Sequence, residues 1–359
     1  MAEPTFPWKT FSKGLLRLRA DRLDVRRGIR CGLVVLVPVV VGYLVGLVEA
    51  GVLVTMGALN LLFDEPSRPE TAEFRVLLVG VFANAGAFAL GTLLAPLPRT
   101  EEAPFVAIGL ALILLPGASP RWQLTSFIAA VMFVLPLGIP PTAWFGFALR
   151  PLAILLGGFA ALVVTVAERA IPVPGRTVPS RFGPPDGPVP ALGLRTMAVH
   201  SIAVGLTAGA GLLIGYEFGL ARDYWVLLTI IVALRVDLAS TVSFSAARIL
   251  GTVAGASVAF LVTSFTQTPW ILFLVLPAVV ALAFATRAVN YTIYALWVTI
   301  AIIVLLSLAY AGGPALAATR LLDTVIGGAL ALGAALLLWI FVHRPSRTRP
   351  PVRTPAARS

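Results

Sequence analysis

Apolar residues fill long stretches of this chain, and few polar positions interrupt them. The stretches are residues 29–48, 52–63, 74–95, 105–116, 124–137 and 147–167, then 194–216, 225–236, 244–265, 270–286, 293–310 and 321–342. An α-helix needs ~20 apolar residues to cross a bilayer. Four of the stretches hold only 12 to 14 residues, which predicts half-helices, buried segments or spans that extend into polar flanks. We expect an all-α integral membrane fold with about twelve transmembrane segments, some of them short or broken.

The two halves of the chain repeat the same landmarks in the same order. The recurring landmarks are a Gly-Tyr segment at residues 42–47 and 215–220, Arg75 and Arg248, and Arg150 and Arg320, the last two each before a Gly-Gly pair. The offset is 173 residues for the first two pairs and 170 for the third. Because each half holds an even number of segments, this pattern predicts two parallel six-helix repeats, related by an axis along the membrane normal.

Charge placement predicts the orientation of the chain. Charged residues make up 12% of it, against roughly 25% in soluble domains. The net charge of +11 comes from arginines at segment ends and tails, which is the positive-inside pattern rather than a nucleic-acid groove. We therefore expect a membrane protein with both termini cytoplasmic. The expected domains are a basic cytoplasmic N-terminal segment (1–28), a first repeat (29–167), a proline-rich cytoplasmic linker (168–193), a second repeat (194–342) and a disordered basic cytoplasmic tail (343–359).

The stretch from 224 to 259 organises the second half. It places two arginines beside an apolar helix pair, where a cation needs water, a partner or an anion because the bilayer centre disfavours charge. Gly251, Gly255 and Ala259 recur every four residues, which predicts one helix face smooth enough for close backbone approach.

The order of residues in the second half resembles the fusaric acid resistance protein-like family, also called the aromatic acid exporter family. The residues that carry this resemblance are Tyr224-Trp225, Thr229, Arg248, Gly251-Thr252, Gly255, Asn290-Tyr291, Arg320, Asp323 and Gly327-Gly328. The resemblance is good over residues 194–342 and weaker over 25–168, where Val52-Leu53 replaces Tyr-Trp and Ala153 replaces the aspartate. It implies a multi-pass protein of the bacterial inner membrane that exports aromatic or other organic acids, driven by the proton motive force. The six-helix unit also resembles plant aluminium-activated malate transporters, which pair two subunits around an anion pore.

Candidate substrate-binding residues follow from charge and ring chemistry. Guanidinium groups bind carboxylates in bidentate fashion and stay charged at physiological pH, and aromatic rings can stack on an aromatic substrate. The candidates are Arg75, Arg150, Arg235, Arg248, Arg320, Tyr224, Trp225, Tyr291, Thr252 and Asn290. If the repeats face each other, we expect the arginines of both halves to converge on one cavity. The alternative is that the arginines anchor topology, that Trp225 anchors at the interface and that Asn290 bonds across helices.

Two carboxylates are candidates for proton coupling. Asp323 lies three residues after Arg320 on the same helix face, so a structural ion pair is the favoured interpretation and proton uptake the sharper one. Asp237 follows Arg235 in a turn, where a helix cap or a local ion pair is favoured. His200, alone in the seventh segment, fits a satisfied core residue better than a proton relay.

The sequence argues against an enzyme. It has two histidines, one cysteine, no Gly-x-Ser-x-Gly elbow and no Gly-x-x-x-x-Gly-Lys-Ser/Thr loop, so we expect no catalytic residues, no metal, no cofactor and no ATP hydrolysis. The expected partners are a small organic anion and membrane lipids, without nucleic acid; a homo-oligomer or a periplasmic adaptor stays open. The leading hypothesis is a proton-coupled exporter of organic anions, and the alternatives are a passive anion channel and a non-transporting membrane scaffold.

Overall fold

The computed structural model describes residues 18–64, 74–139, 146–170, 192–266, 268–309 and 313–341. These residues form helices joined by short turns, which confirms the all-helical prediction for this part of the chain. Most of the expected N-terminal segment and linker, and the whole tail, lie outside the described residues.

The first half holds α2 to α7 and the second half holds α8 to α13. The first six are α2 (Val25–Leu44), α3 (Val48–Asp64), α4 (Phe74–Leu94), α5 (Arg99–Leu114), α6 (Gln123–Val134) and α7 (Gly146–Ala170), with short 3-10 turns η1 (Ala20–Arg22), η3 (Leu115–Ala118) and η4 (Leu135–Gly138). The second six are α8 (Leu194–Glu217), α9 (Tyr224–Ala233), α10 (Leu238–Phe265), α11 (Pro269–Thr286), α12 (Tyr291–Ala309) and α13 (Gly313–Phe341).

Nine helices in the described ranges are long and apolar enough to cross a membrane. One of the nine is α5 together with η3, which span Arg99–Ala118. Three others are shorter: α3 has 17 residues, α6 has 12 and α9 has 10. Three helices begin six or more residues earlier than the apolar pattern indicates, since α5 starts at Arg99, α10 at Leu238 and α13 at Gly313. Flanking residues outside the apolar stretch join each helix, so Arg320 lies two turns inside α13 rather than at its start. The protein is thus a multi-pass helical membrane protein, and the count of twelve spans stays a prediction.

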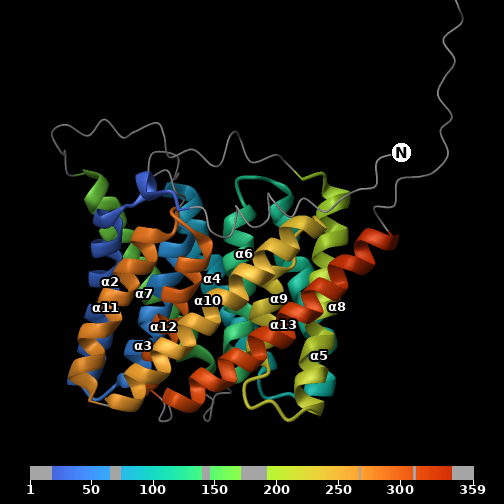
Figure 1. The fold of residues 1–359 in the computed structure, drawn as a ribbon. Helices are drawn as coiled ribbons and strands as arrows, with labels where there is room; N and C mark the ends of the chain where they lie inside the picture. Colours follow the sequence, from blue (N-terminus) through green and yellow to red (C-terminus); the bar gives the residue numbers. More distant parts are fainter. Residues whose placement is uncertain are drawn as a thin grey trace, which may run out of the picture.

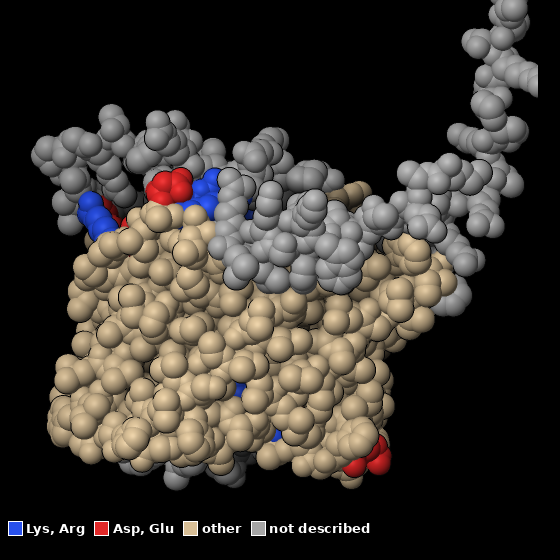
Figure 2. Space-filling model, in the orientation of Figure 1, with Lys and Arg blue, Asp and Glu red and all other residues tan. Residues whose placement is uncertain are grey.

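The helices lie side by side in one bundle (Figure 1). The start of α2, the end of α7, the start of α8 and the end of α13 lie at the upper side of this view. The turn between α8 and α9 lies at the lower side. On the face drawn in Figure 2, a broad belt with few charged residues separates charged groups at the upper end from acidic groups at a lower corner. Such a belt suits a protein surrounded by lipid.

Helices of the two halves pack against each other reciprocally. The first helix of each half packs on the fourth helix of the other, as α2 does on α11 and α8 on α5. Within the halves, α3 packs on α7 and α9 on α13, while α4 packs on α6 and α10 on α12. The short helices also contact one another, α3 with α6 and α6 with α9, and α3 in addition contacts α12.

Small residues permit the closest of these contacts. A Cβ atom added at Gly251 would lie 2.6 Å from the carbonyl oxygen of Thr292, and one added at Gly255 would lie 2.5 Å from that of Leu296. Ala259 is buried on the same helix. The smooth face expected on α10 is therefore confirmed, and it packs against α12.

The repeated Gly-Tyr segment ends α2 and α8 in the same way. Gly46 and Gly219 adopt φ of +75° and +63°, a left-handed conformation that favours glycine. In each case the next residue closes the helix: Leu47 N–H donates to the carbonyl of Gly42 at 2.7 Å, and Leu220 N–H to that of Gly215 at 2.8 Å. This is the geometry of a Schellman cap.

Candidate functional site

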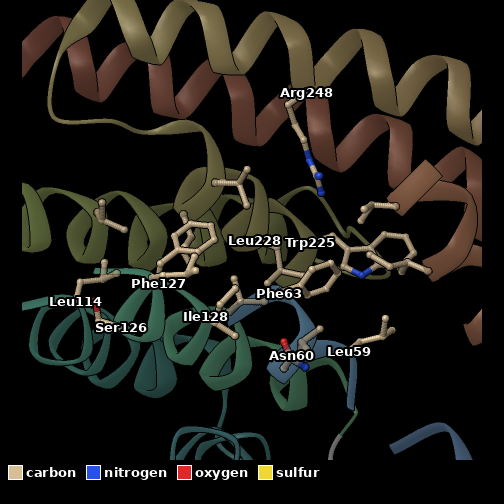
Figure 3. Close-up of a pocket in the computed structure, with 18 of the residues that line it drawn as sticks. Leu59, Asn60, Phe63, Leu114, Ser126, Phe127, Ile128, Trp225, Leu228 and Arg248 are labelled. Atoms are coloured by element: carbon tan, nitrogen blue, oxygen red, sulfur yellow. The ribbon is translucent and has the colours of Figure 1, made fainter. Parts of the chain in front are cut away.

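A cavity of about 670 Å³ lies inside the bundle, and both halves line it. Most of its wall is apolar. The polar and aromatic residues that line it include Asn60, Ser126, Gln123, His200, Tyr224, Trp225, Tyr291, Tyr294, Arg150, Arg235, Arg248, Arg287 and Arg320. Four of the five arginines expected to bind substrate therefore line one cavity. Figure 3 shows Arg248 reaching from α10 toward Trp225, with Asn60 and Ile128 on the opposite wall.

Arg248 and Arg320 form what we call the lower cation pair. Their exposed fractions are 6% and 1%. The Arg320 guanidinium lies over the Trp225 ring, with its carbon 5.1 Å from the ring centroid. Nε of both arginines, and Nη1 of Arg320, have no hydrogen-bond partner among the described residues. The two guanidinium groups also repel each other electrostatically.

Neither member of the lower cation pair has an ion-pair partner in the part of the chain that the structure describes. Burying a charge without a partner is costly, because the charge loses its hydration and gains no interaction to replace it. Two such cations in one cavity, one of them over an indole ring, make a site suited to an anion with an apolar body.

Arg150 lines the cavity with its charge already compensated. Its Nη2 donates to Glu49 Oε1 at 2.8 Å, and its Nη1 donates to the carbonyl of Ile139. Arg75 is exposed in the first turn of α4, outside the lining residues. The expectation that it joins the others in the cavity is wrong, because α4 starts at Phe74 and leaves Arg75 at the end of the bundle.

Arg235 lies in the turn between α9 and α10. Its backbone N–H donates to the hydroxyl of Thr241 at 2.9 Å, which fixes the turn. Its guanidinium carbon lies 4.2 Å from the ring centroid of Phe244 and 5.7 Å from that of Phe127. Within the described residues it forms no ion pair. His200, which also lines the cavity, is close enough to be influenced by this charge.

The aromatic candidates line the cavity, and two of them are fully buried there rather than anchored at the membrane surface. Tyr224 and Trp225 are each 1% exposed, so interface anchoring of Trp225 is wrong. Their ring centroids lie 5.7 Å apart. Tyr291 lines the cavity, with its ring edge-on to Phe244 at 4.9 Å. All three rings are placed where a bound molecule could stack.

Thr252 and Asn290 are not brought into the cavity. Thr252 is buried on α10, and its hydroxyl has no partner among the described residues. Asn290 caps α12, since its Oδ1 accepts from the backbone N–H groups of Thr292 and Ile293 at 2.8 and 3.2 Å. The expectation that these two line the site is wrong, because neither is among the residues that line the cavity and the Asn290 carboxamide oxygen caps α12.

The two carboxylates differ in their surroundings. Asp323 is fully buried on α13, and neither of its carboxyl oxygens has a hydrogen-bond partner in the described residues. The ion pair between Asp323 and Arg320, which was the favoured interpretation, is therefore absent among the described residues. Asp237 caps α10, accepting from Ser240 N–H at 2.7 Å, as the cap interpretation expected. His200 Nδ1 also lacks a hydrogen-bond partner among the described residues, so the interpretation of His200 as a core residue with satisfied hydrogen bonds is wrong.

Sequence reasoning missed Arg287. This residue follows α11, and its Nη2 donates to the carbonyl of Phe63 at 2.9 Å, at the end of α3. Beside it, buried Asp64 accepts from the Thr125 hydroxyl at 2.9 Å. The sequence contained a signal for this residue, because Arg287 is a charged residue directly after an apolar stretch. It was overlooked because no arginine of the first half lies at the repeat offset from Arg287.

A polar cluster joins the halves at the lower end of the bundle. Arg99 Nε donates to Asp223 Oδ2 at 2.8 Å, and Arg99 also pairs with Glu102. Its Nη2 donates to the carbonyl of Leu137 at 3.2 Å. Burial raises the pKa of Asp223 above its usual range, and the charge of Arg99 opposes this rise. Because Asp223 begins α9, this cluster holds Tyr224 and Trp225 in position.

Fold and cavity together define a multi-pass membrane protein with an arginine-lined interior. Residues 208–334 match the model of the family described as fusaric acid resistance protein-like. The match confirms the family resemblance over this part of the chain, which includes Trp225, Arg235 and the lower cation pair. A family of membrane transporters is consistent with a protein that is not an enzyme.

The chain is also similar to "Uncharacterized protein ORF2" of Neisseria gonorrhoeae, with 33% identity over 140 residues. The alignment covers 39% of this chain and 34% of that protein, so the chain spans about a third of the relative's length. No solved structure matches this chain.

Proposed function

We propose that the protein is a secondary transporter of the bacterial inner membrane that binds an aromatic or other organic acid in the cavity and exports it. The observation that carries the proposal is the lower cation pair, buried without a carboxylate partner in the described residues and adjacent to Trp225. A bound carboxylate would supply the missing charge through bidentate hydrogen bonds. The ring of an aromatic acid would pack on the apolar wall.

We propose that transport alternates between inward-facing and outward-facing states built from two parallel repeats. Three observations support this layout: the matching caps at Gly46 and Gly219, the reciprocal helix pairs, and Pro104 and Pro277 inside the equivalent helices α5 and α11. The prolines and the two capping glycines share the offset of 173 residues. Inward-facing and outward-facing states would then interconvert as one repeat moves against the other around a fixed site.

Asp323 is the proposed proton carrier. A protonated carboxyl group costs far less to bury than a carboxylate, and both oxygens of Asp323 lack partners in the described residues. It lies one helical turn from Arg320. When the substrate leaves and Asp323 loses its proton, the freed Arg320 can turn to it. The carboxylate of Asp323 and the carboxylate of the substrate would in this way compete for Arg320, so the substrate and the proton on Asp323 would bind in the same state and cross together.

Flux in proteoliposomes tests the transport proposal. We expect labelled 4-hydroxybenzoate to accumulate several-fold against its gradient when a pH gradient is imposed, and the accumulation to collapse with a protonophore. Asp323→Asn should keep binding but lose the dependence on the pH gradient. Empty liposomes are the control.

The absence of flux for every acid in a broad panel, with and without the gradient, would contradict transport. Currents that reverse at the anion equilibrium potential and ignore Asp323→Asn would instead support a passive channel. The cavity lining includes both Arg150, which bonds Glu49 at the start of α3, and Arg287, which bonds Phe63 near the end of α3, and this extent makes the channel the second candidate.

A further inference from the structure

The cavity runs along α9 and has a cation at each end of this helix. Trp225, with Arg320 above its ring, lies in the first turn of α9, whereas Arg235 lies two residues after its end. Trp225 lies eight residues before the end of α9 at Ala233, which corresponds to about 12 Å at 1.5 Å per residue, and Arg235 lies beyond that end. A single small carboxylate cannot reach both ends.

The second member of the lower cation pair falls at the Trp225 end. Arg248 lies ten residues into α10, about 15 Å from its start beside Arg235. Its guanidinium points toward Trp225 (Figure 3). Leu228, Ile231 and Val232 line the cavity along α9 between the two ends. The cavity therefore has two cationic ends separated by an apolar stretch.

The Arg235 end has the features of a second binding position. Its guanidinium is held by Phe244 and Phe127, so the charge is fixed in place and lacks an ion pair in the described residues. The carboxylate two residues away, Asp237, is engaged in capping α10. His200 lines the same cavity, is influenced by the charge of Arg235, and has an Nδ1 without a hydrogen-bond partner in the described residues. These groups can hold a carboxylate, and the ring of Phe127, which lines the cavity, can pack on its aromatic body.

We infer that the cavity binds two aromatic carboxylates at once, one at the lower cation pair and one between Arg235 and His200, so that a substrate passes from one position to the other. This inference rests on the proposed function, since it assigns a second site for the same class of substrate. The cavity volume of about 670 Å³ can hold two benzoate-sized molecules end to end.

Counting bound ligand tests this inference. Equilibrium dialysis of the purified full chain against radioiodinated 4-iodobenzoate at saturation should give two molecules per chain. Each single variant, Arg235→Gln or Arg248→Gln, should bind one molecule per chain. The double variant that carries both changes should bind none. Arg75→Gln, a matched arginine outside the cavity, should keep two. Thermal unfolding of each variant checks that it is folded.

The possible outcomes separate the two proposals. One molecule per wild-type chain, abolished by Arg248→Gln and kept by Arg235→Gln, overturns the second position and leaves the proposed function intact. Two molecules that persist in Arg235→Gln also overturn it, because the second site would then lie elsewhere. The absence of saturable binding to folded wild type contradicts the proposed function itself.

Discussion

Replacing Arg248 with glutamine should raise the dissociation constant for an aromatic carboxylate by about 10- to 100-fold. A hydrogen bond to a charged group contributes about 1.5–3 kcal/mol, and each 1.4 kcal/mol corresponds to a factor of ten. The same variant should unfold at the same or a higher temperature, because it removes a buried cation that lacks an ion-pair partner in the described residues. Titration of the Trp fluorescence and thermal unfolding measure the two effects.

Arg75→Gln is the matched control for this change. Arg75 stands at the repeat position equivalent to Arg248 but is exposed in the first turn of α4. Its replacement should leave the dissociation constant within about twofold of wild type. Arg248→Lys should give an intermediate loss, because lysine keeps the charge but lacks the planar fork. Equal losses from Arg75→Gln and Arg248→Gln would show that net charge, rather than the cavity, governs binding.

Replacing Gly157 with alanine should destabilise the protein by about 2–3 kcal/mol, the upper range for overpacking a tight contact. An added Cβ would overlap the carbonyl oxygen of Val54, and the reciprocal contact has Gly57 against the carbonyl of Ile154. Backbone atoms cannot rotate away as a flexible side chain can, so α3 and α7 must separate. Thermal denaturation followed by size-exclusion chromatography in one detergent measures the loss.

Gly86→Ala provides the comparison for this glycine. A Cβ added there meets nothing within 4 Å, and the residue lies inside α4. Alanine favours a helix over glycine by about 1 kcal/mol, so this variant should be as stable as wild type or slightly more stable. If both alanine variants behaved alike, the close packing of α3 on α7 would not be what holds the first half together.

Composition and apolar length alone predicted an all-helical membrane protein, because only a helix satisfies its own backbone in lipid. The glycine spacing on α10 predicted a close helix contact, and α10 meets α12 at Gly251 and Gly255. Helix starts were less predictable. Apolar length cannot show that α13 begins at Gly313, and this extension is what places Arg320 inside the bundle.

The candidate site was predicted in part. Arg248, Arg320, Arg235 and Trp225 line the cavity, as expected of charged and aromatic groups within apolar segments. Arg75 shows the limit of the repeat argument, since an equivalent position in sequence does not have an equivalent environment at the end of the bundle. Asn290 shows another limit. A polar residue before an apolar stretch fits both a cap and a binding group, and only the coordinates distinguish them.

The most direct test of an anion site at the lower cation pair is a structure of the protein with 4-iodobenzoate bound, in which iodine marks the ring. We expect a carboxylate within hydrogen-bonding distance of Arg248 and Arg320, with the iodinated ring in the cavity beside Trp225. A dry, ligand-free cavity at saturating 4-iodobenzoate, with both guanidinium groups turned to lipid headgroups or to protein carboxylates, would contradict it.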